Sequence, residues 1–245
     1  VQDSAHKFYI GGEGGASISL NTYFSPNAEQ GNNSFTWITP ANRDFTSNFG
    51  IGGLGGVFLG YQYNPNVAFR FTYDYRGGYS LFVNNNLGFN HTESTTQTYS
   101  EYYSAQGIKF QSFLFDMILN PEVNWGGFVP YVKAGIGLSL NSIGTLKNPG
   151  FYDGANYNTL VNGATTTSFA WDVGIGTHYY FNDKFSVGLG YRFVDVGRLT
   201  TSNVFAVGIP NSFFTGKTLT ISPLQTSHVF LNELLASISY HFDYM

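Results

Sequence analysis

Nine charged residues that could do chemistry stand at alternating positions within otherwise apolar or small-residue segments of this 245-residue chain. They are Glu13, Arg70, Asp74, Arg76, Asp116, Lys133, Asp172, Arg192 and Glu233. Alternate positions of a β-strand share one face, so we expect these side chains to line the interior of a closed sheet. An unpaired charge in a confined interior is costly, and five acids beside four bases therefore predict mutual ion pairs. Two functions stay open for such a network: a structural plug, and a narrow gated pore in which the pairs exchange partners.

The remaining polar residues do not indicate a catalytic or metal-binding arrangement. Five histidines are the candidate bases: His6, His91, His178, His228 and His241. Nucleophilic catalysis would need a serine and an acid beside one of them, but Ser227 and His228 are neighbours along a strand and would point to opposite faces. The chain has no cysteine, which excludes thiolate catalysis and the common structural zinc sites. We therefore expect no catalysis, no metal and no cofactor.

Two glycine-rich segments, 11–15 and 50–56, resemble phosphate-binding loops only superficially. No helical pattern follows either of them, so the context of a nucleotide-binding motif is missing. We interpret these glycines as strand positions where a curved wall packs closely. The net charge of -4 offers no basic stripe for nucleic acid.

The composition favours a β-structure that spans a membrane. Aromatic residues make up 18% of the chain and charged residues 11%, well below the quarter or so that is usual in soluble domains. No apolar run reaches the roughly 18 residues of a transmembrane helix. The mean hydropathy of -0.10 fits a transmembrane barrel, in which apolar and polar residues alternate.

Alternation with period two occurs eight times between turn-rich segments and predicts eight strands. These lie at about 8–20, 49–63, 67–79, 106–119, 128–141, 167–181, 185–198 and 228–242. Three connections, after the second, fourth and sixth strands, are rich in the turn formers Asn, Pro, Gly and Asp. The other four, near 21–48, 80–105, 142–166 and 199–227, are long. Short connections at one end and long ones at the other are typical of outer-membrane barrels.

The two faces of each predicted strand differ in size as well as in polarity. In segment 67–79, the residues Phe69, Phe71, Tyr73 and Tyr75 alternate with Arg70, Thr72, Asp74 and Arg76. In other strands the face opposite the large residues is rich in Gly and Ser, which a narrow interior can hold. We therefore place the apolar face outside, against lipid. Aromatics that recur beside the short turns are interpreted as an interfacial girdle.

Several segments resemble the superfamily of eight-stranded outer-membrane barrels that includes OmpA, OmpX and the opacity proteins. The segments are Gly60-Tyr61-Gln62-Tyr63, the run 129–137, Trp171-Asp172-Val173-Gly174-Ile175-Gly176 and Gly190-Tyr191-Arg192-Phe193. The resemblance covers nearly the whole chain as a strand pattern. It implies an all-β, eight-stranded antiparallel transmembrane β-barrel with short periplasmic turns and four long extracellular loops. That superfamily contains adhesins, anchors and small channels, so the resemblance leaves the function open.

The four long connections carry aromatic side chains among Asn, Ser, Thr and Gly, a composition typical of adaptable recognition surfaces. The recognition candidates are Trp37, Tyr99, Tyr102, Tyr103, Tyr152, Tyr157, Phe213 and Phe214. These aromatics could equally pack the loops against one another. We predict that residues 1–245 form one domain in the bacterial outer membrane, exported and already without its signal peptide.

The predicted function is an integral surface protein with the barrel as an anchor and the loops as the parts that adhere. The alternative is a small gated channel or a transport path for small or apolar solutes. The expected partners are outer-membrane lipid and lipopolysaccharide, together with a host or matrix receptor contacted through the loops. We expect a monomer that does not bind nucleic acid.

Overall fold

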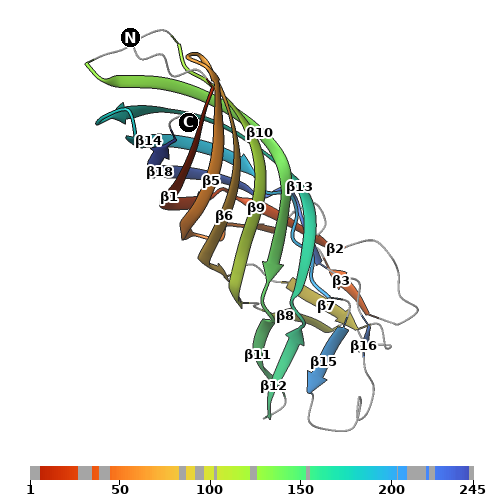
Figure 1. The fold of residues 1–245 in the computed structure, drawn as a ribbon. Coiled ribbons are helices and arrows are strands. Elements are labelled where there is room, and N and C mark those ends of the chain that lie inside the picture. The colour runs from red at the N-terminus through yellow and green to blue at the C-terminus, as the bar shows by residue number, and fades with distance from the viewer. Residues whose placement is uncertain are drawn as a thin grey trace.

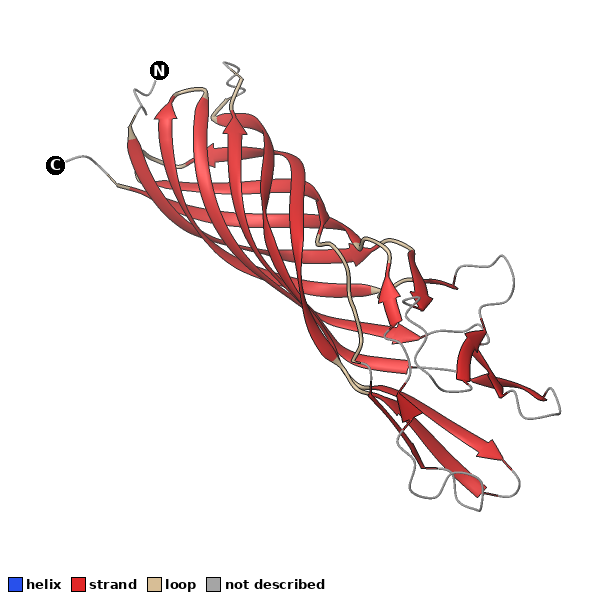
Figure 2. Ribbon diagram, turned by 90° about the vertical axis from the view of Figure 1, so that its right-hand side faces the viewer, coloured by secondary structure: helices blue, strands red, loops and turns tan. Residues whose placement is uncertain are grey.

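The computed structural model describes residues 6–26, 35–38, 45–82, 87–91, 97–101, 104–121, 126–152, 155–202, 204–208, 219–220 and 224–242. Eight long strands form the wall of a barrel (Figures 1 and 2). They are β1 (Lys7–Ser19), β5 (Ile51–Asn64), β6 (Val67–Phe82), β9 (Ser104–Leu119), β10 (Phe128–Ile143), β13 (Ala164–Tyr180), β14 (Phe185–Asp195) and β18 (Phe230–His241). Among the described residues, no helix is long and apolar enough to cross a membrane.

The eight strands pair with their neighbours in a closed antiparallel ring. The order is β1, β5, β6, β9, β10, β13, β14 and β18, and β18 pairs with β1 to complete the circle. Closure leaves no free edge in the wall. The prediction of an eight-stranded antiparallel barrel is therefore confirmed.

Ten shorter strands lie in the described parts of the four long connections. They are β2 (Thr22–Pro26), β3 (Phe35–Ile38), β4 (Phe45–Ser47), β7 (Leu87–His91), β8 (Gln97–Glu101), β11 (Leu146–Tyr152), β12 (Ala155–Val161), β15 (Val204–Gly208), β16 (Leu219–Thr220) and β17 (Leu224–Thr226). The hairpin β11–β12 continues the barrel sheet, because β11 pairs with the start of β9 and β12 pairs with β15. Figure 1 shows these strands beyond one end of the barrel, which we call the loop end. The opposite end, with the three short connections, is the turn end.

Several strand boundaries differ from those predicted, and the differences have local causes. The prediction ended the third barrel strand at 79, but β6 runs to Phe82 after a register shift between Arg76 and Tyr79. Gly78, with φ at +88°, supplies the left-handed conformation there. The predicted strand 185–198 ends early at Asp195, whose Oδ1 accepts a hydrogen bond from the backbone N–H of Gly197 at 2.8 Å. Because Gly197 has φ at +79°, the chain turns inward at this point.

The two faces of the wall separate as the alternation predicts. On β6, Phe71 is 50% exposed on the outside, whereas Arg70 inside is 4% exposed. The outer face carries exposed large apolar side chains on every barrel strand. Aromatic rings also contact one another beside the short turns, as in the pairs Phe128–Tyr179 and Phe185–Tyr240. The outer wall is thus an apolar surface bordered by aromatic residues at the turn end.

Candidate functional site

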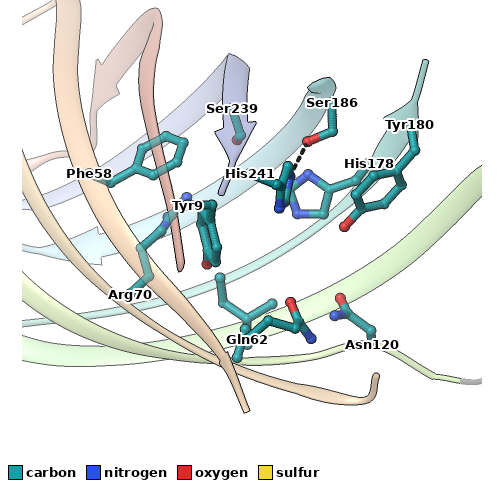
Figure 3. Close-up of a pocket in the computed structure, with 12 residues that line it drawn as sticks. Tyr9, Phe58, Gln62, Arg70, Asn120, His178, Tyr180, Ser186, Ser239 and His241 are labelled. Carbon is teal, nitrogen blue, oxygen red and sulfur yellow. Dashed lines mark hydrogen bonds between the residues drawn. The ribbon is translucent and has the colours of Figure 1, made fainter. Parts of the chain in front are cut away.

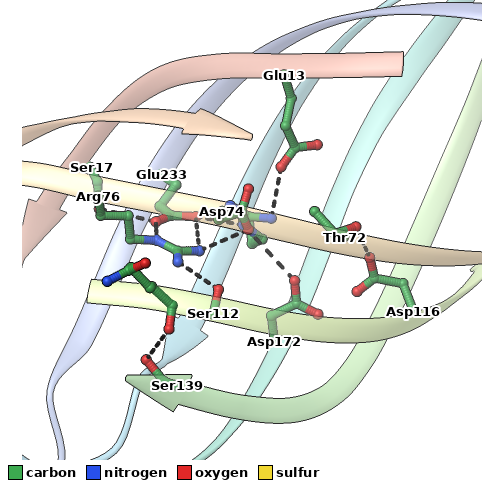
Figure 4. A network of polar contacts seen from close by, with 12 residues as sticks. Glu13, Ser17, Thr72, Asp74, Arg76, Ser112, Asp116, Ser139, Asp172 and Glu233 are labelled. Carbon is green, nitrogen blue, oxygen red and sulfur yellow. Dashed lines mark hydrogen bonds and ion pairs between the residues drawn. The ribbon is translucent and has the colours of Figure 1, made fainter. Parts of the chain in front are cut away.

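All nine charged residues singled out from the sequence lie buried inside the barrel, where they form one network, and Figure 4 shows part of it around Arg76, Asp74 and Glu233. They come from seven of the eight barrel strands. The eighth strand, β5, contributes Gly56, where an added Cβ would overlap the carboxylate of Asp74. The network therefore depends on small residues in the barrel wall, which leave room for the charged side chains at the same height.

Arg192 lies at the centre of the network and contacts four carboxylates. Its Nη1 donates to Glu13 Oε1 at 2.9 Å, and its Nε donates to Glu233 Oε2 at 2.5 Å. Its Nη2 lies 3.0 Å from Asp74 Oδ2, close enough for an ion pair although the two atoms do not have hydrogen-bond geometry. Its Nε is also 3.9 Å from Asp172 Oδ2. One guanidinium thus holds together side chains from four strands.

The other three bases give each of these carboxylates a second partner. Arg76 lies 2.5 Å from Glu233 and 3.2 Å from Asp74. Lys133 lies 2.5 Å from Asp172 and 3.1 Å from Asp116. Arg70 completes the chain of contacts, at 3.3 Å from Glu13 and 3.2 Å from Asp116. As a result, each of the five acids contacts two bases.

Hydroxyl groups satisfy part of the remaining hydrogen-bonding capacity. Thr72 donates to Asp116 at 3.0 Å, and Ser17 donates to Glu233 at 3.0 Å. Arg76 Nη1 in turn donates to Ser112 at 2.7 Å. A buried charge network is stable only when its members are paired and hydrogen-bonded. This one lies in the middle of the lumen, and all nine of its charged residues are buried.

Above the charge network, towards the loop end, the lumen is filled by apolar side chains. This apolar plug consists of Phe49, Tyr79, Leu81, Ala105, Ile108, Phe110, Ile143, Leu146, Val194, Val196, Leu199, Val229 and Leu231, all buried. Val196 and Leu199 belong to the segment that turns inward after β14, and Asn141 Nδ2 donates to the backbone oxygen of Val196. The expectation of a small and polar inner face is therefore wrong for this part of the barrel. The interior becomes apolar where the chain beyond β14 enters it.

Below the network, at the turn end, a small polar cavity remains (Figure 3). Its volume is about 20 Å³, which is enough for a water molecule. His178 and His241 line it, and His241 Nε2 lies 3.0 Å from Ser186 Oγ. Arg70 closes the top of this cavity and joins it to the network. The lumen thus has three levels: polar cavity, charge network and apolar plug.

The loop recognition candidates are placed only in part. Trp37 lies on β3 and pairs with Phe89, which pairs in turn with Tyr99 of β8. Tyr152 and Tyr157 lie on the hairpin β11–β12. The side chains of Trp37, Tyr99, Tyr152 and Tyr157 are not described. Tyr102, Tyr103, Phe213 and Phe214 lie outside the described residues.

One histidine has an acidic partner that sequence reasoning missed. His228 Nδ1 lies 2.7 Å from Asp195 Oδ2 on the outer wall, and Trp171 Nε1 donates to the same oxygen at 3.0 Å. Ser227, by contrast, accepts from the backbone of Tyr23 and donates to the backbone oxygen of His228. The pairing depends on the register of β13, β14 and β18, which alternation alone does not give. An acid, Asp195, at the end of the row of alternating outward-facing residues Tyr191 and Phe193 was the only signal in the sequence.

Comparisons with known proteins agree with this architecture. A family model described as an outer membrane protein beta-barrel domain matches residues 1–213. Outer membrane protein PagN of Salmonella typhimurium is 26% identical over 203 residues, which make up 77% of this chain and 72% of that protein. The crystal structure of the outer membrane protease OmpT from Escherichia coli is similar with a TM-score of 0.54 and 7% identity, over 99% of both chains. Neisserial surface protein A has a TM-score of 0.45 and 15% identity, over 96% of this chain and 97% of its own. The likeness to OmpT shows the fold alone.

Proposed function

This chain belongs to the outer membrane protein β-barrel family, and on that basis we propose that its barrel anchors extracellular loops that adhere to structures outside the cell. It is an outer-membrane protein, and in barrels of that membrane the long loops are extracellular, so we infer that the loop end faces outwards. The observation that carries the proposal is a contrast between the two parts of the molecule. The lumen is filled by the charge network and the apolar plug, whereas the long connections contain ordered strands beyond the barrel.

The hairpin β11–β12 is joined directly to the barrel sheet. Leu146, its first residue, is buried in the apolar plug and pairs with Ala105 at the start of β9. A recognition surface gains affinity when it is held rigid before binding. Tyr152 and Tyr157 on this hairpin, with the other loop aromatics, are the proposed contacts for a host or matrix receptor.

The proposal extends to the lipid around the barrel, to the oligomeric state and to the domain organisation. Outer-membrane lipid and lipopolysaccharide would cover the apolar outer wall. A closed wall has no free edge for pairing, which supports a monomer. The continuous pairing from the barrel into β11, β12, β15 and β16 supports a single domain over residues 1–245. The proposal includes no catalytic step and no cofactor, and the resemblance to a protease at 7% identity concerns only the fold.

Removing the hairpin tip tests the adhesive role. Residues 148–159 are replaced by Asn-Gly, a two-residue turn suited to a hairpin, so that the opposed pair Lys147 and Leu160 is retained. Non-adherent bacteria that display the parent protein should bind cell monolayers or immobilised matrix. We expect the shortened variant to bind about tenfold less, because a few aromatic residues carry most interface energy.

Asp183→Ala, at the turn end, is the control and should bind like the parent. Heat-modifiable migration on SDS gels would verify that each variant is a closed barrel. Unchanged adhesion by a folded, surface-displayed hairpin variant would contradict the role assigned to this hairpin. The transport alternative has less support, because the apolar plug lies directly above the charge network.

A further inference from the structure

The outer wall of the barrel carries a local group of polar side chains near the loop end, on β13, β14, β18 and the residues just before β18. We call it the rim cluster, and it comprises Trp171, Tyr191, Asp195, His228 and Asn232. Trp171 is opposite Asp195 in the register, and Asp195 is opposite Phe230. The outer wall is apolar at the same level on the next strands, β1 and β5. Asn232 is opposite Ile18, which is opposite Ile51, and these two apolar side chains are 40% and 67% exposed.

Asp195 fixes the orientation of the His228 ring. Its Oδ1 accepts from the backbone N–H of Gly197, and its Oδ2 accepts from Trp171 Nε1 and contacts His228 Nδ1. The carboxylate is buried, whereas the His228 side chain is 46% exposed. Because Nδ1 must carry a proton to bond a carboxylate, Nε2 is left to point away from Asp195. That nitrogen accepts a hydrogen bond when the ring is neutral and donates one when the ring is protonated.

Asn232 presents the complementary group. Its Oδ1 accepts a hydrogen bond from the hydroxyl of Tyr191. Its amide Nδ2 therefore points away from this bond and has donors to offer. Asn232 and His228 lie on the same face of the chain, four residues apart. Together they offer a donor and an acceptor, the combination that a hydroxyl-bearing partner requires.

Aromatic rings form the apolar part of the same surface. The rings of Phe193 and Phe230 are stacked, with centroids 5.5 Å apart and an interplanar angle of 14°. His228 is stacked with Phe230, with ring centroids 6.3 Å apart, and the ring centroids of Trp171 and Phe193 are 5.9 Å apart. The aliphatic faces of sugar rings pack on such aromatic surfaces. An ordinary interfacial girdle would need the aromatics but not the oriented His and Asn.

The rim cluster lies at the level where lipid tails give way to headgroups. A tilted transmembrane strand needs about ten residues to cross the hydrocarbon core. Counted from the aromatic residues at the turn end, about ten residues separate Phe185 from Asp195 and Tyr240 from Phe230. Because the loop end faces outwards, this level belongs to the outer leaflet.

We propose that the rim cluster binds the saccharide headgroup of an outer-leaflet glycolipid, lipopolysaccharide. A sugar ring of the headgroup packs against Phe193 and Phe230, and hydroxyls of the headgroup on either side of this ring bond to His228 Nε2 and Asn232 Nδ2. A phospholipid ammonium would instead need a free carboxylate, and Asp195 already has three hydrogen-bond partners. The proposal rests on the lipid surroundings given under the proposed function, and it is independent of adhesion by the loops.

The test uses the full protein in nanodiscs of phosphatidylethanolamine that contain increasing amounts of purified rough lipopolysaccharide. Native mass spectrometry after mild release counts the lipopolysaccharide molecules retained on each barrel. For the double variant His228→Phe, Asn232→Leu, the half-saturating lipopolysaccharide fraction should rise about tenfold, the effect of losing two hydrogen bonds of ordinary strength. Asn232→Leu alone leaves the contact between Asp195 and His228 in place and should give a smaller rise.

Gln111→Leu is the matched control, because Gln111 Oε1 accepts a hydrogen bond from Tyr73 on another part of the outer wall, at 2.9 Å. This variant removes a hydrogen bond between a tyrosine hydroxyl and a side-chain amide, like the bond between Tyr191 and Asn232. It should leave the retention of lipopolysaccharide unchanged. Parent-like half-saturation in the double variant His228→Phe, Asn232→Leu would overturn the rim cluster as the site. Phosphatidylethanolamine retained by the parent and lost by these variants would overturn the choice of a sugar. If the parent itself retains no lipopolysaccharide, the proposed lipid surroundings fail together with the site.

Discussion

Gly135 on β10 shows how closely the charge network is fitted to the wall around it. A Cβ added at this position would overlap the carboxylates of Asp116 and Asp172, the two acids that share Lys133. Gly135→Ala should therefore lower the free energy of unfolding by about 1–3 kcal/mol, because overpacking forces neighbouring side chains to move. Urea titration of the refolded protein in lipid vesicles, followed by tryptophan fluorescence, measures this change.

Gly55→Ala is the matched control for Gly135→Ala. Gly55 is also a strand glycine, but it faces outwards and a Cβ there meets nothing within 4 Å. Its free energy of unfolding should stay within about 0.5 kcal/mol of the parent. Equal losses for the two variants would mean that Gly135 matters through its backbone and not through the space it leaves for the carboxylates.

Individual residues also mark what the sequence can and cannot predict. The inward placement of Arg192 or Glu233 follows from alternation, because neighbouring positions on a strand face opposite sides. The partner of each charge does not follow, since it depends on the stagger between strands far apart in the chain. Asp195 and His228 are 33 residues apart, and they meet only because the register of β14 and β18 brings them to the same rim.

At the level of elements, the alternating pattern predicted the barrel strands well and the long connections poorly. In β9 and β10, outward-facing apolar residues alternate with inward-facing residues over almost the full length of the strand. Their apolar side was therefore predictable. The connections lack such a face and form strands such as β11 and β12 by continuing an existing sheet. The apolar plug was missed for a related reason. Val196 and Leu199 lie beyond the end of β14, where the period of two no longer reports which way a side chain points.

The apolar plug should behave as a soluble protein core inside a membrane barrel. Phe110 and Phe115 lie on the same strand, β9, but Phe110 is fully buried in the plug and Phe115 is 53% exposed on the outer wall. Phe110→Ala should cost about 3–5 kcal/mol, as truncation of a buried Phe does in a packed core. It should also increase proteolysis in β11–β12, because Leu146 packs in the same plug.

Phe115→Ala is the control for the plug, since its ring faces outwards and leaves no internal cavity. It should destabilise the barrel less than Phe110→Ala and should leave proteolysis of the hairpin unchanged. The measurements are urea unfolding in vesicles and limited proteolysis with mass-spectrometric mapping of the cut sites. If the two alanine variants matched in both, the interior of the loop end would not be a packed core.

In the whole molecule, the charge network and the apolar plug lie at different levels of the lumen and have different tasks. The charge network ties the strands of the wall together at mid-height through Arg192 and its four carboxylates. The apolar plug joins the wall to the strands beyond the loop end. Because the two levels use different residues, opening one of them should not open the other.

That separation predicts the electrical behaviour of the protein. The refolded parent should show no discrete ion steps in a planar bilayer, and Glu233→Gln should be equally silent, because the apolar plug stays in place when the network loses one charge. Glu233 contacts both Arg76 and Arg192, so this substitution disturbs the centre of the network while keeping its shape. Discrete steps that appear only in Glu233→Gln would show that the charges alone close the lumen, and they would restore the gated channel as the better account of function.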